Sequence, residues 1–129
     1  PDEIYGVECD VFSPCGLGGI VNHHSIQQFK CQVIAGSANN QLATEEDGLR
    51  LFENGILYAP DYVINGGGLI YAAMHHIDEP DGEIAKKTAE IASTLSEIFS
   101  ESISQNKPSS EVADRIAQQR LYDLSKTTR

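Results

Sequence analysis

Three neutral amide side chains stand where apolar runs of this sequence end. Asn39 and Asn40 lie in the stretch "VIAGSANNQ", which begins with a β-branched apolar run and carries no charge, and Asn65 ends "PDYVIN" before three glycines. An asparagine amide offers a donor and an acceptor without net charge, which suits a carboxamide or a ribose hydroxyl. Asparagine and glycine also form ordinary turns, so each loop taken alone has a plain structural explanation.

The cysteines and histidines give a weaker chemical signal. Cys9, Cys15 and Cys31 form no C-x-x-C pair, and the histidines are adjacent pairs at 23–24 and 75–76. Adjacent side chains on a helix point about 100° apart and do not converge on one ion. We therefore expect no metal site, and we interpret the cysteines as buried thiols of a protein in the reducing cytoplasm.

The elements that would position the three amides alternate along the chain. Strands are predicted at "CDVFSPC", "CQVIAG" and "ILYAP", which are short apolar runs bounded by proline or glycine. Helices are predicted at "NHHSIQQFK" with Asn22 as N-cap, at "TEEDGLRLFENG" between Thr44 and Gly55, and at "GGGLIYAAMHH". This alternation predicts an α/β fold with a parallel sheet and right-handed crossovers.

The predicted topology places three similar loops on one edge of the sheet. In open parallel sheets, ligands bind beyond the carboxyl ends of the strands. The loops there are "SPCGLGG", "GSANNQ" and "PDYVINGGG", whereas a loop at the other end, "ENG", is typical of a plain connector. Glycine and alanine let a flat ligand approach the backbone. We therefore predict that Asn39, Asn40 and Asn65 meet at one binding edge.

The sequence from residue 82 to residue 125 is predicted to form a helical tail. Apolar residues recur at spacings of three and four from Ile84 to Phe99, which indicates one amphipathic helix, and Pro108 ends it. The inward side of a last helix is predicted to carry Ile116, Leu121 and Leu124. With the strands and helices up to about residue 77, this tail makes one domain that is large enough to bury a core.

Composition excludes several classes of partner. The 129 residues carry a formal net charge of -10, and their nine Lys and Arg are scattered, so a nucleic-acid partner is not expected. No apolar run approaches the roughly 18 residues of a membrane span, and no secretory signal is expected. The expected partner is therefore a small molecule.

The three loop strings also carry a family resemblance. In their order, "SPCGLGG", "VIAGSANNQL" and "GILYAPDYVINGGG" closely resemble the cofactor domain of the glutamate, leucine, phenylalanine and valine dehydrogenases, and most of all its leucine-type members. Such long strings are more specific than a lone glycine motif, and the resemblance covers nearly the whole chain. It implies the second half of a Rossmann-type parallel sheet with a C-terminal helical tail.

The resemblance also implies an activity and its site. The implied enzyme is NAD-dependent, forms a homo-oligomer at full length, and oxidatively deaminates leucine and other branched-chain L-amino acids to 2-oxo acids and ammonia. The positions implied to bind the cofactor are Gly16, Leu17, Ala38, Asn39 and Asn40. The positions implied to bind the substrate are Asn40, Asn65, Leu69 and Ala72.

Parts of the implied enzyme are not expected in this chain. The sequence has no G-x-G-x-x-G motif, and the resemblance places the glycine-rich phosphate loop and the substrate domain, with its catalytic lysine and aspartate, before Pro1. Hydride transfer needs a general base near the amine and a clamp for the carboxylate, so we expect no catalytic residue here and no activity from the chain alone. The alternative is a stand-alone, non-catalytic module for nucleotide binding or subunit assembly, which the long helices would suit.

Overall fold

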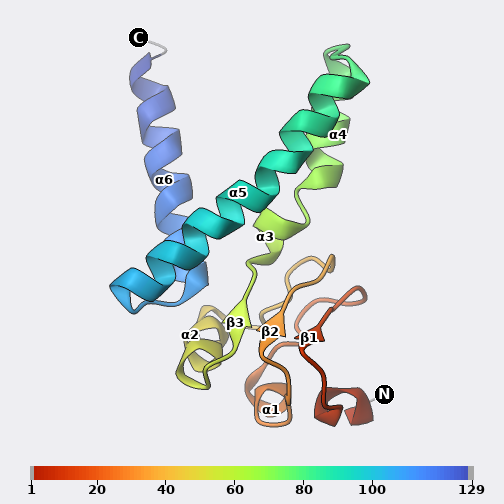
Figure 1. The fold of residues 1–129 in the computed structure, drawn as a ribbon, viewed down its shortest axis with the longest axis vertical. Helices are drawn as coiled ribbons and strands as arrows, with labels where there is room; N and C mark the ends of the chain where they lie inside the picture. Colours follow the sequence, from red (N-terminus) through yellow and green to blue (C-terminus); the bar gives the residue numbers. More distant parts are fainter. Residues whose placement is uncertain (1, 128–129) are drawn as a thin grey trace.

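A parallel sheet forms the base of the molecule. The computed structural model describes residues 2–127. Its strands are β1 (Val11–Phe12), β2 (Val33–Ile34) and β3 (Leu57–Tyr58). They are parallel and adjacent in the order β1-β2-β3, with Val33 beside Val11 on one side and beside Leu57 on the other. The predicted α/β class with a parallel sheet is confirmed, and the carboxyl ends of all three strands share one edge (Figure 1).

Seven helical segments accompany the sheet within the described chain. They are η1 (Asp2–Gly6), α1 (His23–Ile26), α2 (Glu45–Glu53), α3 (Asp61–Ile64), α4 (Gly67–His76), α5 (Asp81–Gln105) and α6 (Ser109–Thr127). The sequence did not predict η1 or α3, because each is a single short turn without an apolar period. Helix α3 starts after Pro60, and the conformation of Asn65 (φ -91°, ψ 2°) separates it from α4.

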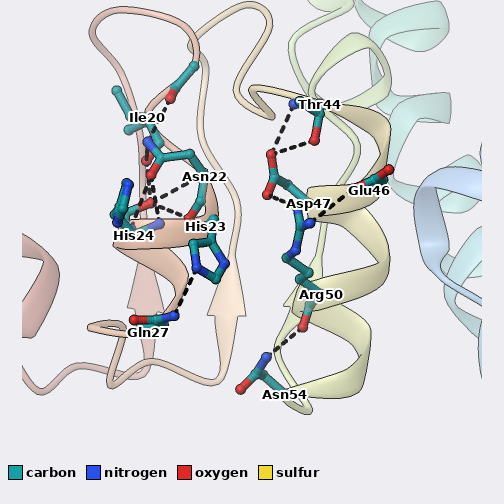
Figure 2. Close-up of polar contacts among 12 residues, drawn as sticks. Ile20, Asn22, His23, His24, Gln27, Thr44, Glu46, Asp47, Arg50 and Asn54 are labelled. Carbon is teal, nitrogen blue, oxygen red and sulfur yellow. Dashed lines mark hydrogen bonds and ion pairs between the residues drawn. The ribbon is translucent and has the colours of Figure 1, made fainter.

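Helices α1 and α2 begin at the residues predicted to cap them (Figure 2). The side chain of Asn22 accepts a hydrogen bond from the backbone N–H of Ser25 at 3.2 Å. In α2, the N–H and the hydroxyl of Thr44 donate to the buried carboxylate of Asp47 at 3.0 and 2.8 Å, and Arg50 pairs with the same carboxylate at 2.8 Å. These contacts satisfy donors that the first turn of a helix leaves open, and so they fix where each crossover begins.

Two apolar clusters hold the fold together. The cluster beneath the sheet contains Val21, Ile26, Cys31, Ile34, Leu51, Ile56 and Tyr58. The cluster of the helical tail contains Ile98, Val112, Ala113 and Ile116. The buried hydroxyl of Ser109 donates to the carbonyl oxygen of Tyr58 at 2.5 Å, which ties the start of α6 to the end of β3.

The helical tail opens away from the sheet. Figure 1 shows α4 lying along the first half of α5, while α6 leaves the junction with α5 and diverges from it. Ile116 is buried as predicted, but Leu121 and Leu124 are 68% and 65% exposed, so their predicted inward placement was wrong. No helix among residues 2–127 is both long and apolar enough to cross a membrane.

Candidate functional site

The loops that follow β1 and β2 pack directly on each other. The backbone N–H of Ala38 donates to the carbonyl oxygen of Pro14 at 2.9 Å. The backbone N–H of Gly19 donates to the carbonyl oxygen of Asn40 at 2.7 Å. A Cβ atom at Gly36 would lie only 2.2 Å from the Pro14 carbonyl oxygen, a distance that no side chain can adopt. The glycine therefore permits the approach that brings the two loops together.

The loop after β2 is also tied to α3. The side-chain amide of Asn65 donates to Asn39 Oδ1 at 2.7 Å, and the N–H of Gln41 donates to Asp61 Oδ2 at 3.2 Å. The N–H of Asp61 in turn donates to the hydroxyl of Tyr58 at 3.2 Å. Burial, together with the charge of Asp61, raises the pKa of Tyr58, so this phenol stays protonated at neutral pH. The three loops thus form one hydrogen-bonded edge.

Helix α3 connects this edge to the helical tail. The hydroxyl of Tyr62 donates to Asp114 Oδ1 of α6 at 2.5 Å. Burial and this hydrogen bond raise the pKa of Tyr62, so the phenol remains the donor across the neutral pH range. One short helix therefore contacts α6 through Tyr62 and the loop after β2 through Asn65.

A hollow of about 640 Å³ lies between the loop after β2 and the segment from α3 to α4. Four of the residues predicted for binding line it, namely Asn39, Asn40, Asn65 and Leu69. Three polar residues that the sequence reasoning did not single out line it as well, namely Ser37, Asp61 and Tyr62. Each stands in one of the quoted loops, so membership of those loops was the signal that could have identified them.

The lining offers neutral donors. The side-chain nitrogen of Asn39 and the whole amide of Asn40 make no hydrogen bond within residues 2–127, and both residues are exposed. Asn40 adopts a left-handed backbone conformation (φ 51°), which asparagine tolerates better than most residues. No Lys or Arg of the described chain lines the hollow, whereas Asp61 adds a carboxylate. The site is therefore suited to hydroxyl and amide groups.

The other predicted positions do not line the hollow. Gly16 and Leu17 are exposed in the loop after β1. Ala38 is buried, and its carbonyl oxygen accepts from Gln41 Nε2 at 2.9 Å. Ala72 is exposed on α4, and it does not join Leu69 in the lining. Their roles in binding stay predictions.

The three cysteines are free, and they differ in exposure. Cys31 is buried, which raises the pKa of its thiol, and Cys9 is partly buried. Cys15 is exposed, so its predicted burial was wrong, because it stands on the loop after β1 rather than in the strand. Hydrogen bonds from the side chain and backbone of Ser37 lower the pKa of Cys15 to about 7. Within residues 2–127, no three His, Cys, Asp or Glu side chains cluster as metal ligands would.

Known proteins share this sequence and fold. Residues 1–127 match the family described as glutamate/leucine/phenylalanine/valine dehydrogenase. Leucine dehydrogenase of Thermoactinomyces intermedius is 46% identical over 127 residues, which cover 98% of this chain and 35% of that protein. Phenylalanine dehydrogenase of Bacillus thermotolerans is 44% identical over 118 residues, which cover 92% of this chain and 31% of that protein.

A solved structure gives the same match in three dimensions. The crystal structure of L-tryptophan dehydrogenase from Nostoc punctiforme superposes with a TM-score of 0.92 at 40% sequence identity, and the match covers 98% of this chain and 38% of that chain. The sheet and the helical tail therefore have a close counterpart in a solved dehydrogenase. The chain spans about a third of the length of the curated relatives that it matches.

Proposed function

The chain belongs to the glutamate, leucine, phenylalanine and valine dehydrogenase family, and we propose that it forms the second half of the dinucleotide-binding domain of an amino-acid dehydrogenase. The proposed reaction is the NAD-dependent oxidative deamination of leucine and other branched-chain L-amino acids to 2-oxo acids and ammonia. The observation that carries the proposal is the amide-lined hollow at the carboxyl ends of the parallel strands, where α/β sheets bind ligands.

The residues of the hollow fit one end of NAD. The nicotinamide end of NAD presents ribose hydroxyl groups and the carboxamide of the nicotinamide ring, which pair well with the free amide nitrogen of Asn39 and the free amide of Asn40. The diphosphate fits less well, since the described lining contains the carboxylate of Asp61 and no cationic side chain. We therefore assign the hollow to the nicotinamide end, with Gly16, Leu17 and Ala38 as further proposed cofactor contacts.

NAD, when bound, would accept the hydride that leaves the substrate Cα. Asn39 and Asn40 would hold the ribose and carboxamide, and Asn40 and Asn65 would orient the polar end of the amino acid. Asn65 already positions Asn39 through their 2.7 Å hydrogen bond, so the proposed cofactor and substrate contacts share one network. The general base and the carboxylate clamp lie outside this set of residues, so we expect the chain alone to be inactive.

The proposed preference for branched aliphatic substrates rests on Leu69 and Ala72. Leu69 is 76% exposed and lines the hollow, so its apolar side chain is available to a substrate. A methylene group more or less is worth about 1 to 3 kcal/mol of discrimination in such a pocket, so small changes there redirect specificity. Relatives named leucine, phenylalanine and tryptophan dehydrogenase all match the chain, so the preference for branched aliphatic substrates is part of the proposal.

A second role, in subunit assembly, has its own support. Leu121, Tyr122 and Leu124 are exposed on the outer half of α6. Apolar side chains gathered on one helix are typical of a surface that another chain or domain covers. We propose that the full-length enzyme is a homo-oligomer of the cytoplasm, where three free cysteines would stay reduced.

NADH binding tests the proposed site. We expect Asn39→Ala to weaken NADH binding about tenfold in a fluorescence titration of the product of the complete reading frame, because the variant loses an amide contact and its tie to Asn65. The matched control is Asn54→Ala, whose amide donates to the Arg50 carbonyl oxygen at the end of α2. The control should bind within twofold of the wild type.

Two results would count against the site. Equal Kd values for Asn39→Ala and the wild type would remove Asn39 from the cofactor contacts. A wild-type protein that oligomerises and shows no response to NADH would favour the non-catalytic assembly module instead.

A further inference from the structure

We propose that Gln41 is a positioning residue for this reaction. Its side chain does not line the hollow, yet it fixes the loop that presents Asn39 and Asn40 there. The inference deepens the proposed function and rests on it, since it concerns the loop that we assign to the nicotinamide end of the cofactor.

The side chain of Gln41 makes two hydrogen bonds inside the loop. Gln41 is 0% exposed, and its Nε2 donates to the carbonyl oxygens of Gly36 at 2.8 Å and of Ala38 at 2.9 Å. Ala38 directly precedes Asn39, and both Gly36 and Ala38 are buried against Pro14. One amide therefore satisfies two buried carbonyl groups and sets the curvature of the loop just before the residues at the hollow.

The backbone of Gln41 anchors the same loop on both sides. Its N–H donates to Asp61 Oδ2 at 3.2 Å, and its carbonyl oxygen accepts from the N–H of Val21 at 3.0 Å. Gln41 thus joins the loop after β2 to α3 and to the segment that enters α1. A change at this point would reach Asn39 and Asn40 without removing any group that touches a ligand.

The two polar atoms of the Gln41 side chain differ in their surroundings. Among residues 2–127, Gln41 Oε1 is the buried side-chain polar atom that lacks a hydrogen-bond partner. A buried amide oxygen without a partner opposes folding, whereas methionine has a similar length and no such group. The feature that glutamine has and methionine lacks here is therefore the donor Nε2, which holds the two carbonyl groups of the loop in place. Misplacing a positioned group by about 1 Å can cost about 100-fold in rate.

The test compares Gln41→Met with Ile98→Val in the product of the complete reading frame. Ile98 is 1% exposed in the cluster of the helical tail and does not line the hollow, so its variant lowers Tm without changing a residue of the loop. For Gln41→Met we expect kcat/KM for branched-chain amino acids to fall at least about tenfold, with faster amide hydrogen exchange in residues 36–41. Ile98→Val should keep kcat and KM within about twofold at temperatures where both variants are folded.

The outcomes separate this inference from the proposed function. Wild-type kinetics in Gln41→Met would overturn the inference while leaving the function standing. A wild-type protein without activity on any amino acid would overturn the function and the inference with it. If Gln41→Met does not fold, Gln41→Asn replaces it, because the shorter amide cannot reach both carbonyl oxygens and should show the same kinetic loss.

Discussion

Asn39 and Asn40 are neighbours, but different interactions hold them at the hollow. Asn65 fixes the side chain of Asn39 through a 2.7 Å hydrogen bond, whereas the left-handed backbone (φ 51°) and the bond from Gly19 hold Asn40. Both keep amide donors free for a ligand. The sequence predicted that Asn39, Asn40 and Asn65 lie on one edge because strand ends and loop composition are local features, whereas Leu69 was expected only from the family resemblance.

Other residues of the site were not singled out from the sequence, although Asp61 and Tyr62 stand in one of the quoted loops. Asp61 and Tyr62 reach the hollow only because α3 forms. A single helical turn is too short to show an apolar period, so the sequence pattern did not predict α3. Cys15 was predicted to be buried from its apolar neighbours in sequence. Its exposure depends on where the loop after β1 ends in space, which residues distant in sequence decide.

The thiol of Cys15 provides a prediction about pH. Hydrogen bonds from Ser37 lower the pKa of this thiol to about 7, so the thiolate fraction should rise through neutral pH rather than near the usual value of about 8.5. The rate of alkylation by iodoacetamide should therefore reach half its maximum near pH 7. Ser37→Ala should move this midpoint to higher pH, and a wild-type midpoint above about 8.5 would contradict the prediction.

At the scale of elements, the site depends on how closely two loops and one short helix approach. The caps of α1 and α2 were readable from Asn22 and Thr44, because capping depends on nearby residues. The direction of α6 could not be predicted from the sequence, since it depends on packing between helices. Helix α3 is the structural link, with Asn65 bonded to the loop after β2 and Tyr62 bonded to α6.

The approach of the first two loops can be tested through glycine. Gly36→Ala should lower the free energy of unfolding by about 1 to 3 kcal/mol, because the new Cβ atom would meet the backbone of Pro14. Gly82→Ala is the matched control, since no atom lies within 4 Å of its Cβ position and alanine favours the helix α5 by up to about 1 kcal/mol. Urea denaturation measures both, and equal stability of Gly36→Ala and the wild type would refute the tight approach.

At the scale of the whole molecule, two features bear on the proposed function, namely the exposed apolar side chains of α6 and the length of the chain relative to its relatives. The outer half of α6 diverges from α5 (Figure 1), and its Leu121, Tyr122 and Leu124 are exposed. The chain also spans about a third of the length of the curated relatives that it matches. Both observations are compatible with the proposed enzyme, in which this chain would bind the cofactor and other parts would supply the general base and cover the exposed helix.

The central claim is that this chain is the cofactor-binding part of a branched-chain amino-acid dehydrogenase. The most direct measurement is NADH formation, which is followed by the absorbance of the reduced nicotinamide. The product of the complete reading frame and the 129-residue chain should be assayed in parallel with leucine, valine, isoleucine, phenylalanine and glutamate. We predict that the product of the complete reading frame is active on the branched-chain acids and that the 129-residue chain is not. No activity from either protein on any of the five amino acids would contradict the account.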